Sequence, residues 1–409
     1  MLRTGEQRQA GLPPGLNPAS PEHAADPHPL YHQMREQAPV YRFVPRRSGL
    51  VHWYLTRYAD VQRALHDRDL GRQLDRLPAA LAAQHRRWEF DPLAMLRQNV
   101  FNLDPPDHTR LHRLIAPSFS ARAVAVTSQC IPGLADEIID ELAEAGGEAD
   151  VLTALALPMA IRVIAELIGF PRDGIVALRR WSHLLRSGDP VRARTAGLEF
   201  MAYFDEMIYP RYVEPGEDLL SRLIQAERDG QLSHAELLAG VFQLLLAGDE
   251  TTVNLIGNAV VELLRHPGEL ARLRAQPDLI GSAVEEVIRF NGPVGHSQFL
   301  YALADVEIGG AVIPRGDIVV PILLAANRDP AVFPDPDTFD ISRSPNRHLG
   351  FGHGIHFCLG AEVARLQARA AVGSLLRRFP GLALAVNPAE LEWKPGLFLH
   401  GMRRVPVLL

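Results

Sequence analysis

The sequence of 409 residues has little of what would mark a secreted or membrane-spanning protein. It contains only two cysteines, Cys130 and Cys358, which is too few for a disulfide framework, so we expect a reducing, cytoplasmic setting. The first 20 residues are polar and rich in proline and glycine, without the apolar core of a signal peptide. No apolar run reaches the ~20 residues of a membrane span, so we expect no membrane contact.

The chain also lacks an excess of positive charge. Its 42 Lys and Arg residues stand against 48 Asp and Glu residues, for a net charge of −6, and no basic tract appears. A slightly acidic chain repels phosphate backbones, so we expect no nucleic-acid partner. With 47% hydrophobic and 22% charged residues, the composition is that of a folded globular protein and excludes disordered or collagen-like chains.

The pattern predicts a mainly α fold with a smaller β-rich lobe. Residues 1–27 are interpreted as a flexible lead-in, and residues 28–409 as a single domain. We expect a β-hairpin over 40–56, an irregular binding loop or lid over 70–102, and mainly helices over 108–303. Further segments are predicted as strands near 305–321 and at the C-terminus, an ordered coil over 327–357 and a helix over 361–378.

One helix is unusually long. Ser233 and Glu236 have the spacing of a capping box, and apolar residues continue from Leu237 to Leu264 before His266-Pro267. A helix of about 32 residues would be ~48 Å long. Because its middle is apolar on most sides, we expect it to run through the core.

The segment from Phe351 to Gly360, FGHGIHFCLG, carries the strongest chemical signal. Its cysteine, Cys358, stands directly before a predicted helix, where free N–H groups and the helix dipole favour a thiolate. The glycines allow the backbone to approach a flat partner closely. Such a thiolate can serve as an axial iron ligand of haem. A buried structural cysteine is the alternative, but the whole motif favours the ligand.

Glu250 and Thr251 form a second candidate site within the long helix. A mid-helix threonine can donate its hydroxyl to the carbonyl four residues back, here that of Ala247. Gly248 removes bulk beside it, so we expect a groove that fits a diatomic ligand. An acid next to an alcohol can relay protons from solvent. A polar notch in a core helix is the alternative interpretation.

With these motifs in order along the chain, the sequence resembles the cytochrome P450 family in its soluble bacterial form. The resemblance extends from about Pro39 onward and includes Glu286-Val-Ile-Arg289 and a later segment, Phe333 to Arg343. It implies haem b between the long helix and the cysteine-bearing helix, with Cys358 as the metal ligand. Implied cofactor contacts are His356, His108, His112, Phe351, Gly352, Gly360, Ala247 and Gly248.

The resemblance also assigns other roles. Thr251 and Glu250 are implied as catalytic residues, and Glu286, Arg289 and Arg343 as a buried structural network. Taken alone, a Glu-Arg pair three residues apart would be an ordinary surface ion pair. The substrate pocket is expected to involve residues 70–102, residues from Trp181 to Phe204, the long helix and the turns at Val294 and Phe398.

Two departures from the family pattern concern the groups that hold the haem propionates. His112 stands where the family usually has arginine, and no Lys or Arg occurs between Arg289 and Arg315. We therefore expect His108, His112 and His356, with His296 or Gln298 as further candidates, to serve in place of arginines. A histidine loses its charge just above neutrality, so haem retention is predicted to weaken on the alkaline side.

The implied function is a monooxygenase that inserts one atom of O2 into an apolar organic substrate by hydroxylation or epoxidation. No dinucleotide or iron–sulfur motif appears, so electrons must come from a separate ferredoxin or flavodoxin with its reductase. Arg110, Arg113 and Arg347 are candidates for docking that partner, or simply form a solvated face. The alternatives are a peroxide-driven oxidase, another P450-type reaction such as nitric oxide reduction, a non-catalytic haem ligand sensor and a helical protein without haem. We expect a monomer.

Gln243 and Leu246 are predicted substrate contacts. Gln243 lies two helical turns before Thr251 on the same face, ~12 Å along the axis. A glutamine among apolar neighbours needs a partner when buried. That partner is either a polar group of the substrate or another helix of the protein, and the sequence favours neither.

Overall fold

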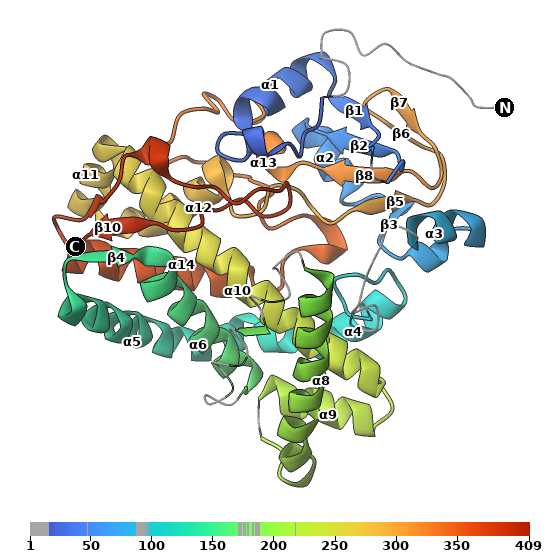
Figure 1. Cartoon of the computed structure of the whole chain (residues 1–409), viewed down its shortest axis with the longest axis horizontal. Coiled ribbons are helices and arrows are strands. Elements are labelled where there is room, and N and C mark those ends of the chain that lie inside the picture. The colour runs from blue at the N-terminus through green and yellow to red at the C-terminus, as the bar shows by residue number, and fades with distance from the viewer. Residues whose placement is uncertain are drawn as a thin grey trace. The chain divides into compact units, whose positions relative to one another are not determined.

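The computed structural model describes residues 16–46, 48–86, 96, 98–170, 174, 177, 180, 181, 184, 189–216 and 218–409. Figure 1 labels its helices and strands. The chain divides into two compact units. The first unit comprises Met1–His85, Glu285–Phe357 and Glu392–Arg403, and the second comprises Arg86–Val284, Cys358–Leu391 and Arg404–Leu409. The predicted single domain over residues 28–409 stays a prediction.

The first unit is built on a five-stranded sheet of order β1-β2-β8-β5-β3. The predicted hairpin is confirmed: β1 (Val40–Phe43) pairs antiparallel with β2 (His52–Leu55). β8 (Ile318–Pro321) lies parallel to β2 and antiparallel to β5 (Leu300–Ala302), which pairs with β3 (Leu70–Gly71). A separate hairpin of β6 (Val306–Ile308) and β7 (Ala311–Ile313) turns at Gly309–Gly310, where both residues have positive φ.

Short helices complete this unit. They are α1 (His28–Gln37), which contacts α13 (Leu323–Ala326), together with α2 (Tyr58–Ala64) and α3 (Ala79–Arg86), whose last residue belongs to the second unit. The prediction that 70–102 is irregular is wrong for 70–86, which contain β3, a 3₁₀ turn at Leu74–Arg76 and α3. Residues 87–95 and 97 lie outside the described residues. The alanine-rich α3 lacks an apolar stripe, so periodicity could not reveal it.

Part of the predicted lead-in makes ordered contacts. Residues 1–15 lie outside the described residues, but Pro21–His23 form a 3₁₀ turn. The carbonyl of Leu16 accepts a 3.0 Å hydrogen bond from the Tyr41 hydroxyl, and Leu16 packs against the apolar core of the first unit. The flexibility of the lead-in as a whole stays a prediction.

The second unit is helical, with one small sheet of order β4-β10-β9. Its helices are α4 (Asp107–Ile115), α5 (Ala121–Ala145), α6 (Leu157–Ile168), α8 (Pro190–Val213), α9 (Leu219–Arg228), α10 (His234–Arg265), α11 (Pro267–Ala275) and α14 (Ala361–Arg378). Its strands are β4 (Glu148–Asp150), β9 (Ala383–Leu384) and β10 (Pro406–Leu408). α12 (Ile280–Asn291) begins in this unit and ends in the first.

The end of α6 shows why glycine stands between two helices. α6 ends before Gly169, which is left-handed at φ +86°. A Cβ on Gly169 would lie 2.2 Å from Cγ of Asp218, whose side chain caps the start of α9. Only glycine combines that backbone conformation with so close an approach.

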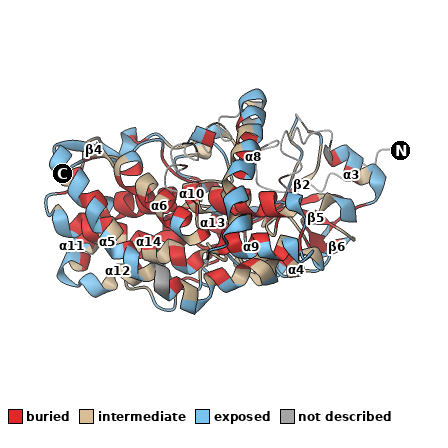
Figure 2. Ribbon diagram, turned by 90° about the horizontal axis from the view of Figure 1, so that it is seen from below, coloured by how far each residue is buried: buried red, intermediate tan, exposed pale blue. Residues whose placement is uncertain are grey.

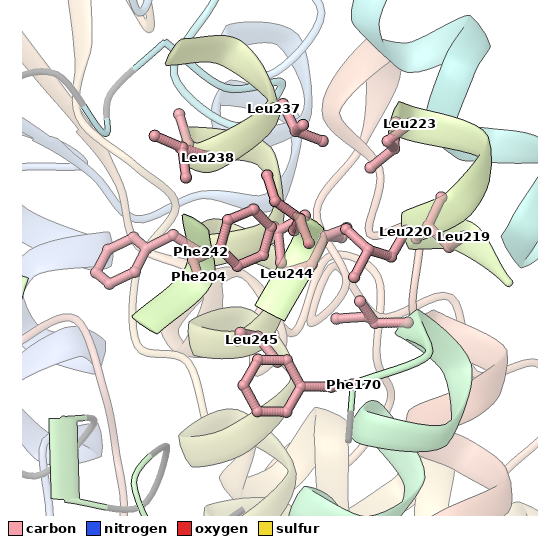
Figure 3. Close-up of a cluster of buried hydrophobic side chains, with 14 of the residues drawn as sticks. Phe170, Phe204, Leu219, Leu220, Leu223, Leu237, Leu238, Phe242, Leu244 and Leu245 are labelled. Carbon is pink, nitrogen blue, oxygen red and sulfur yellow. The ribbon is translucent and has the colours of Figure 1, made fainter. Parts of the chain in front are cut away.

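The long helix α10 is confirmed with its predicted capping box, in which the Ser233 hydroxyl accepts from the Glu236 N–H. It has 32 residues and packs against α6, α14 and α9. Figure 2 shows α6, α10 and α14 largely buried, whereas much of α8 is exposed. α8, α9 and α10 share an apolar cluster with Phe170, drawn in Figure 3.

Among the described residues, none of the helices is long and apolar enough to cross a membrane.

Candidate functional site

The middle of α10 carries one open face in an otherwise buried helix. Between Leu237 and Leu263 every residue is buried except six, of which Ala247 is exposed and the others are half-buried: Gln243, Leu246, Gly248, Glu250 and Thr251. All but Gly248 fall within one side of the helix at 3.6 residues per turn. We call these five residues (243, 246, 247, 250 and 251) the open face. Because the rest of this part of α10 is buried, the open face leaves room for a ligand.

The predicted bond within the open face is present. The Thr251 hydroxyl donates to the Ala247 carbonyl over 2.7 Å, four residues back along the helix. This bond fixes the side-chain rotamer and turns the lone pairs of Oγ1 away from the helix backbone. Glu250 adjoins it and is half-buried. The pair therefore presents an alcohol oxygen and a carboxyl group at the open face.

Gly248 has a packing role that the sequence did not predict. A Cβ at this position would lie 2.8 Å from Cδ1 and 2.9 Å from Cγ1 of Ile164 in α6. The missing side chain is therefore replaced by Ile164, and the glycine allows α6 and α10 to pack closely. The groove expected beside Gly248 stays a prediction.

Gln243 shares the open face with Thr251, as predicted from its spacing. Its side chain makes no hydrogen bond to any other residue that the structure describes. A contact with another described helix, the alternative left open by the sequence, is thus excluded. The amide of Gln243 is available to a ligand.

Cys358 directly precedes α14, which packs against α10 in the same unit. Its side chain is exposed in the chain alone, yet the surrounding protein desolvates it enough to raise the pKa of the thiol. The Gly360 N–H and Arg365 act in the opposite direction, as expected at a helix start. Burial outweighs these two effects, so the pKa of the thiol is raised on balance.

The loop before Cys358 adopts backbone conformations that favour glycine. Gly352 and Gly354 have φ of +76° and +73°, and a Cβ on Gly354 would lie 2.7 Å from the Leu65 carbonyl oxygen. The loop also exposes two large apolar side chains, Ile355 and Phe357. Exposed apolar side chains of this kind suit contact with a flat, apolar partner.

Two of the predicted histidines lie side by side. His108 and His112 are one turn apart on α4, with ring centroids 5.4 Å apart; His108 is buried and His112 half-buried. Burial lowers the pKa of His296 to about 4, and its ring stacks on Phe299. Its suggested role toward a propionate stays a prediction. Arg113 is exposed, which agrees both with docking of a redox partner and with a solvated face. Arg110 instead pairs with Glu236 inside the second unit.

The first unit brings together Glu286, Arg289 and Arg343, as the resemblance implies. Arg289 and Glu286 are fully buried and joined by two hydrogen bonds of 2.7 Å. Nε of Arg343 donates to Glu286 over 3.2 Å. The two arginines also donate to main-chain carbonyls between Asn327 and Thr338, which fixes the predicted coil.

Sequence reasoning missed two members of this network. The Asp340 N–H and the Asn346 side chain both donate to Glu286, over 3.0 and 3.2 Å. Neither carries a distinctive spacing, since one contributes only its backbone and the other lies 60 residues along the chain. Of the predicted pocket residues, Trp181 and Phe204 lie in the core of the second unit. Val294 and Phe398 belong to the first unit, where Phe398 packs against His296.

The residues present fit a haem with a thiolate ligand. Cys358 is the one described cysteine near this surface, the other being on α5, and its exposed sulfur directly before α14 can reach a metal ion. In the same unit as Cys358, the open face of α10 supplies a surface for a small ligand.

Comparisons with known proteins decide the family. The cytochrome P450 family model matches residues 201–386. Cytochrome P450 107B1 of Saccharopolyspora erythraea is 43% identical over 94% of this chain and 95% of its own length. The chain belongs to the cytochrome P450 family.

Two further relatives agree with this assignment. The mycinamicin IV hydroxylase/epoxidase of Micromonospora griseorubida is 37% identical over 92% of this P450 and 94% of its own length. The crystal structure of the myxobacterial P450 CYP267B1 with myristic acid covers 95% of this chain and 98% of its own, at 40% identity and a TM-score of 0.89. The predicted fold is thereby confirmed, and the protein is a P450 monooxygenase with a haem-thiolate cofactor.

Proposed function

We propose that this P450 uses haem b, with Cys358 as the iron ligand, to insert one atom of O2 into an apolar organic substrate. The open face of α10 carries this proposal, because it sets an alcohol, a carboxyl group and apolar side chains together in an otherwise buried helix. α14, which begins beside Cys358, packs against that same helix.

When bound, haem with a thiolate ligand supplies the oxygen-activating chemistry of the family. Cys358 provides the sulfur, and the Gly360 N–H and Arg365 favour its charged form. Thr251 donates its own proton to Ala247, so Oγ1 accepts a hydrogen bond from a ligand or water at the open face. Glu250 can take up and release a proton beside it, which gives a two-residue relay.

The substrate is proposed to be largely apolar with one polar group. Leu246 and Ala247 offer apolar contact on the open face, and Gln243 offers a single amide two turns from Thr251. Among the relatives, one is named for hydroxylation and epoxidation, and another was crystallised with myristic acid. Hydroxylation or epoxidation of a molecule with an apolar body is consistent with both.

A separate ferredoxin or flavodoxin with its reductase is proposed as the electron donor. Arg113 and Arg347 are exposed and suit an acidic partner, whereas Arg110 is engaged by Glu236. Single charge reversals at Arg113 and Arg347 should slow electron transfer more at low salt than at high salt, because salt screens exposed charges.

The proposal is tested with the haem-loaded enzyme, a surrogate ferredoxin and reductase, NADH and a substrate that displaces the distal water from the haem. Under ¹⁸O2, a monooxygenase gives product with one labelled oxygen atom. Equal labelling from H2¹⁸O2 alone, without NADH, would identify a peroxide-driven oxidase instead. A haem spectrum that changes with ligands while no product forms with either oxidant would identify a sensor.

A further inference from the structure

The outer face of α8 carries an apolar stripe. Val191, Leu198, Ala202, Tyr209 and Val213 follow one another at intervals of seven, four, seven and four residues, so they lie along one side of the helix. All five are exposed; the four larger side chains are 73%, 50%, 72% and 70% exposed in chain order. Figure 2 shows the exposed side of α8 plainly. Large apolar side chains gathered on one face indicate an interaction surface.

Charges of opposite sign flank the two ends of this stripe. Arg192 and Arg194 lie in the first half of α8, and Asp205 and Glu206 in the second half. At about 100° per residue, Arg194 and Asp205 fall on one flank of the stripe, and Arg192 and Glu206 on the other. Glu199, on the flank of Arg192, is paired with Arg180. The face is therefore basic at one end and acidic at the other.

Most of this charge is not neutralised within the protein. Arg194 and Glu206 form no ion pair with any residue that the structure describes. Arg192 contacts Asp189 over 3.4 Å and Asp205 contacts His234 over 3.1 Å, but these pairs are largely exposed and contribute little. The charges can therefore pair with a partner that presents the opposite order.

We propose that this face binds α8 of a second copy of the chain in antiparallel orientation. A two-fold axis at the level of residue 200 places Leu198 opposite Ala202 of the second copy and Val191 opposite its Tyr209. The same axis places Arg194 opposite Asp205 and Arg192 opposite Glu206, each pair on its own flank. Every contact is then made twice, as a two-fold interface requires.

The inner side of α8 is already occupied. Phe200 and Phe204 are buried, and the Phe200 ring meets that of Phe242 in α10 at a centroid distance of 4.8 Å. Figure 3 shows Phe204 and Phe242 within this cluster. Substitutions on the outer face leave this packing unchanged, so the variants below should fold and bind haem normally.

The dimer is expected to be weak. The stripe extends from Val191 to Val213, which is ~33 Å of helix at 1.5 Å per residue. One helix face of this length buries less than the ~1,200 Å² typical of stable interfaces. Association should therefore depend on protein concentration and on salt, and the monomer expected from the sequence should predominate at high dilution.

Two charge variants of the haem-loaded protein test the arrangement by sedimentation velocity. Arg192→Glu/Arg194→Glu makes both ends of the face acidic, and Asp205→Arg/Glu206→Arg makes both ends basic. Each variant alone should associate at least about tenfold more weakly than the wild type, because like charges then meet. An equimolar mixture should regain association, since an acidic face then meets a basic one.

Matched controls separate this account from general effects of charge. Arg274→Glu, an exposed residue of α11, should leave association unchanged, and Leu198→Glu should abolish it. Haem content and the thermal transition should be the same in all variants. A wild-type protein that stays monomeric up to about 1 mM, or a mixture that associates no better than its two components, would overturn the proposal.

Discussion

Two regions of this P450 each contain a glutamate on a helix, and they use it in opposite ways. Glu286 in the first unit is fully enclosed and accepts hydrogen bonds from Arg289, Arg343, Asp340 and Asn346. Glu250 in the second unit stands at the open face of α10, beside a threonine that has an available oxygen. The first region has every charge compensated, whereas the second keeps polar groups where a ligand can reach them.

The difference separates structural from functional polar groups. A buried charge is tolerated when partners replace its lost hydration, and such a network then fixes the backbone around it. Polar groups left at an open face of a core helix contribute little to packing and are retained for chemistry. Removing a hydrogen-bond partner of Glu286 should therefore unfold the first region. Removing a polar group of the open face should instead inactivate the enzyme.

The largest effect is expected for Arg289→Ala. Glu286 would keep a buried charge with fewer partners, so the free energy of unfolding should fall by ~3–5 kcal/mol, measured by chemical denaturation. Arg272→Ala is a matched control, because Arg272 also pairs with a glutamate three residues earlier, but on the exposed surface. Arg272→Ala should lower the free energy of unfolding by less than ~1 kcal/mol. Equal losses for both variants would contradict the account.

Thr251→Ala should leave stability and haem content unchanged and affect the reaction. Without the Oγ1 acceptor, product formed per NADH consumed should fall by about 10²-fold, with peroxide released instead. Thr251→Ser retains a hydroxyl and should recover most of the loss. Normal product yield in Thr251→Ala would show that this hydroxyl does not handle protons.

Gly248 and Gly240 both lie in α10 but differ in their surroundings. Gly248→Ala should destabilise the protein by ~1–3 kcal/mol because its Cβ would meet Ile164. Gly240→Ala has no atom within 4 Å of its Cβ and should be neutral or stabilise by up to ~1 kcal/mol. In a protein that already carries Ile164→Ala, Gly248→Ala should lower the free energy of unfolding by less. An unchanged loss would exclude the contact between position 248 and Ile164.

The smallest effect is expected for Gln243→Leu. Losing one hydrogen bond should weaken binding of a substrate with a polar group by about tenfold, with haem content intact. Binding is measured from the spectral change on displacement of the distal water. A substrate analogue without the polar group should bind both proteins equally. Unchanged affinity for every confirmed substrate would remove Gln243 as an anchor.

The sequence predicted what depends on local pattern. The capping box at Ser233 and the apolar run after it fixed α10 to within a residue, and the four-residue spacing from Ala247 to Thr251 predicted their hydrogen bond. The helix after Gly360 and the hairpin at Val40 were likewise predicted, because periodicity and turn residues are local signals.

What depends on distant neighbours could not be predicted. Nothing near Gly248 in the sequence indicates Ile164, which lies on another helix. The raised pKa of Cys358 arises from surrounding protein, which outweighs the local helix dipole. Asp340 contributes to the network through its backbone N–H. Because almost every residue has this group, the residue type does not indicate the contact. Tertiary contacts of this kind require the structure.

The central claim, that Cys358 supplies the thiolate, is tested most directly by the spectrum of the reduced carbon monoxide adduct. The wild type and the control Cys130→Ser should both show the red-shifted Soret band of a thiolate-ligated haem, whereas Cys358→Ser should lose it, with or without retained haem. A thiolate-type band that persists in Cys358→Ser, or a wild-type protein that binds no haem, would contradict the account.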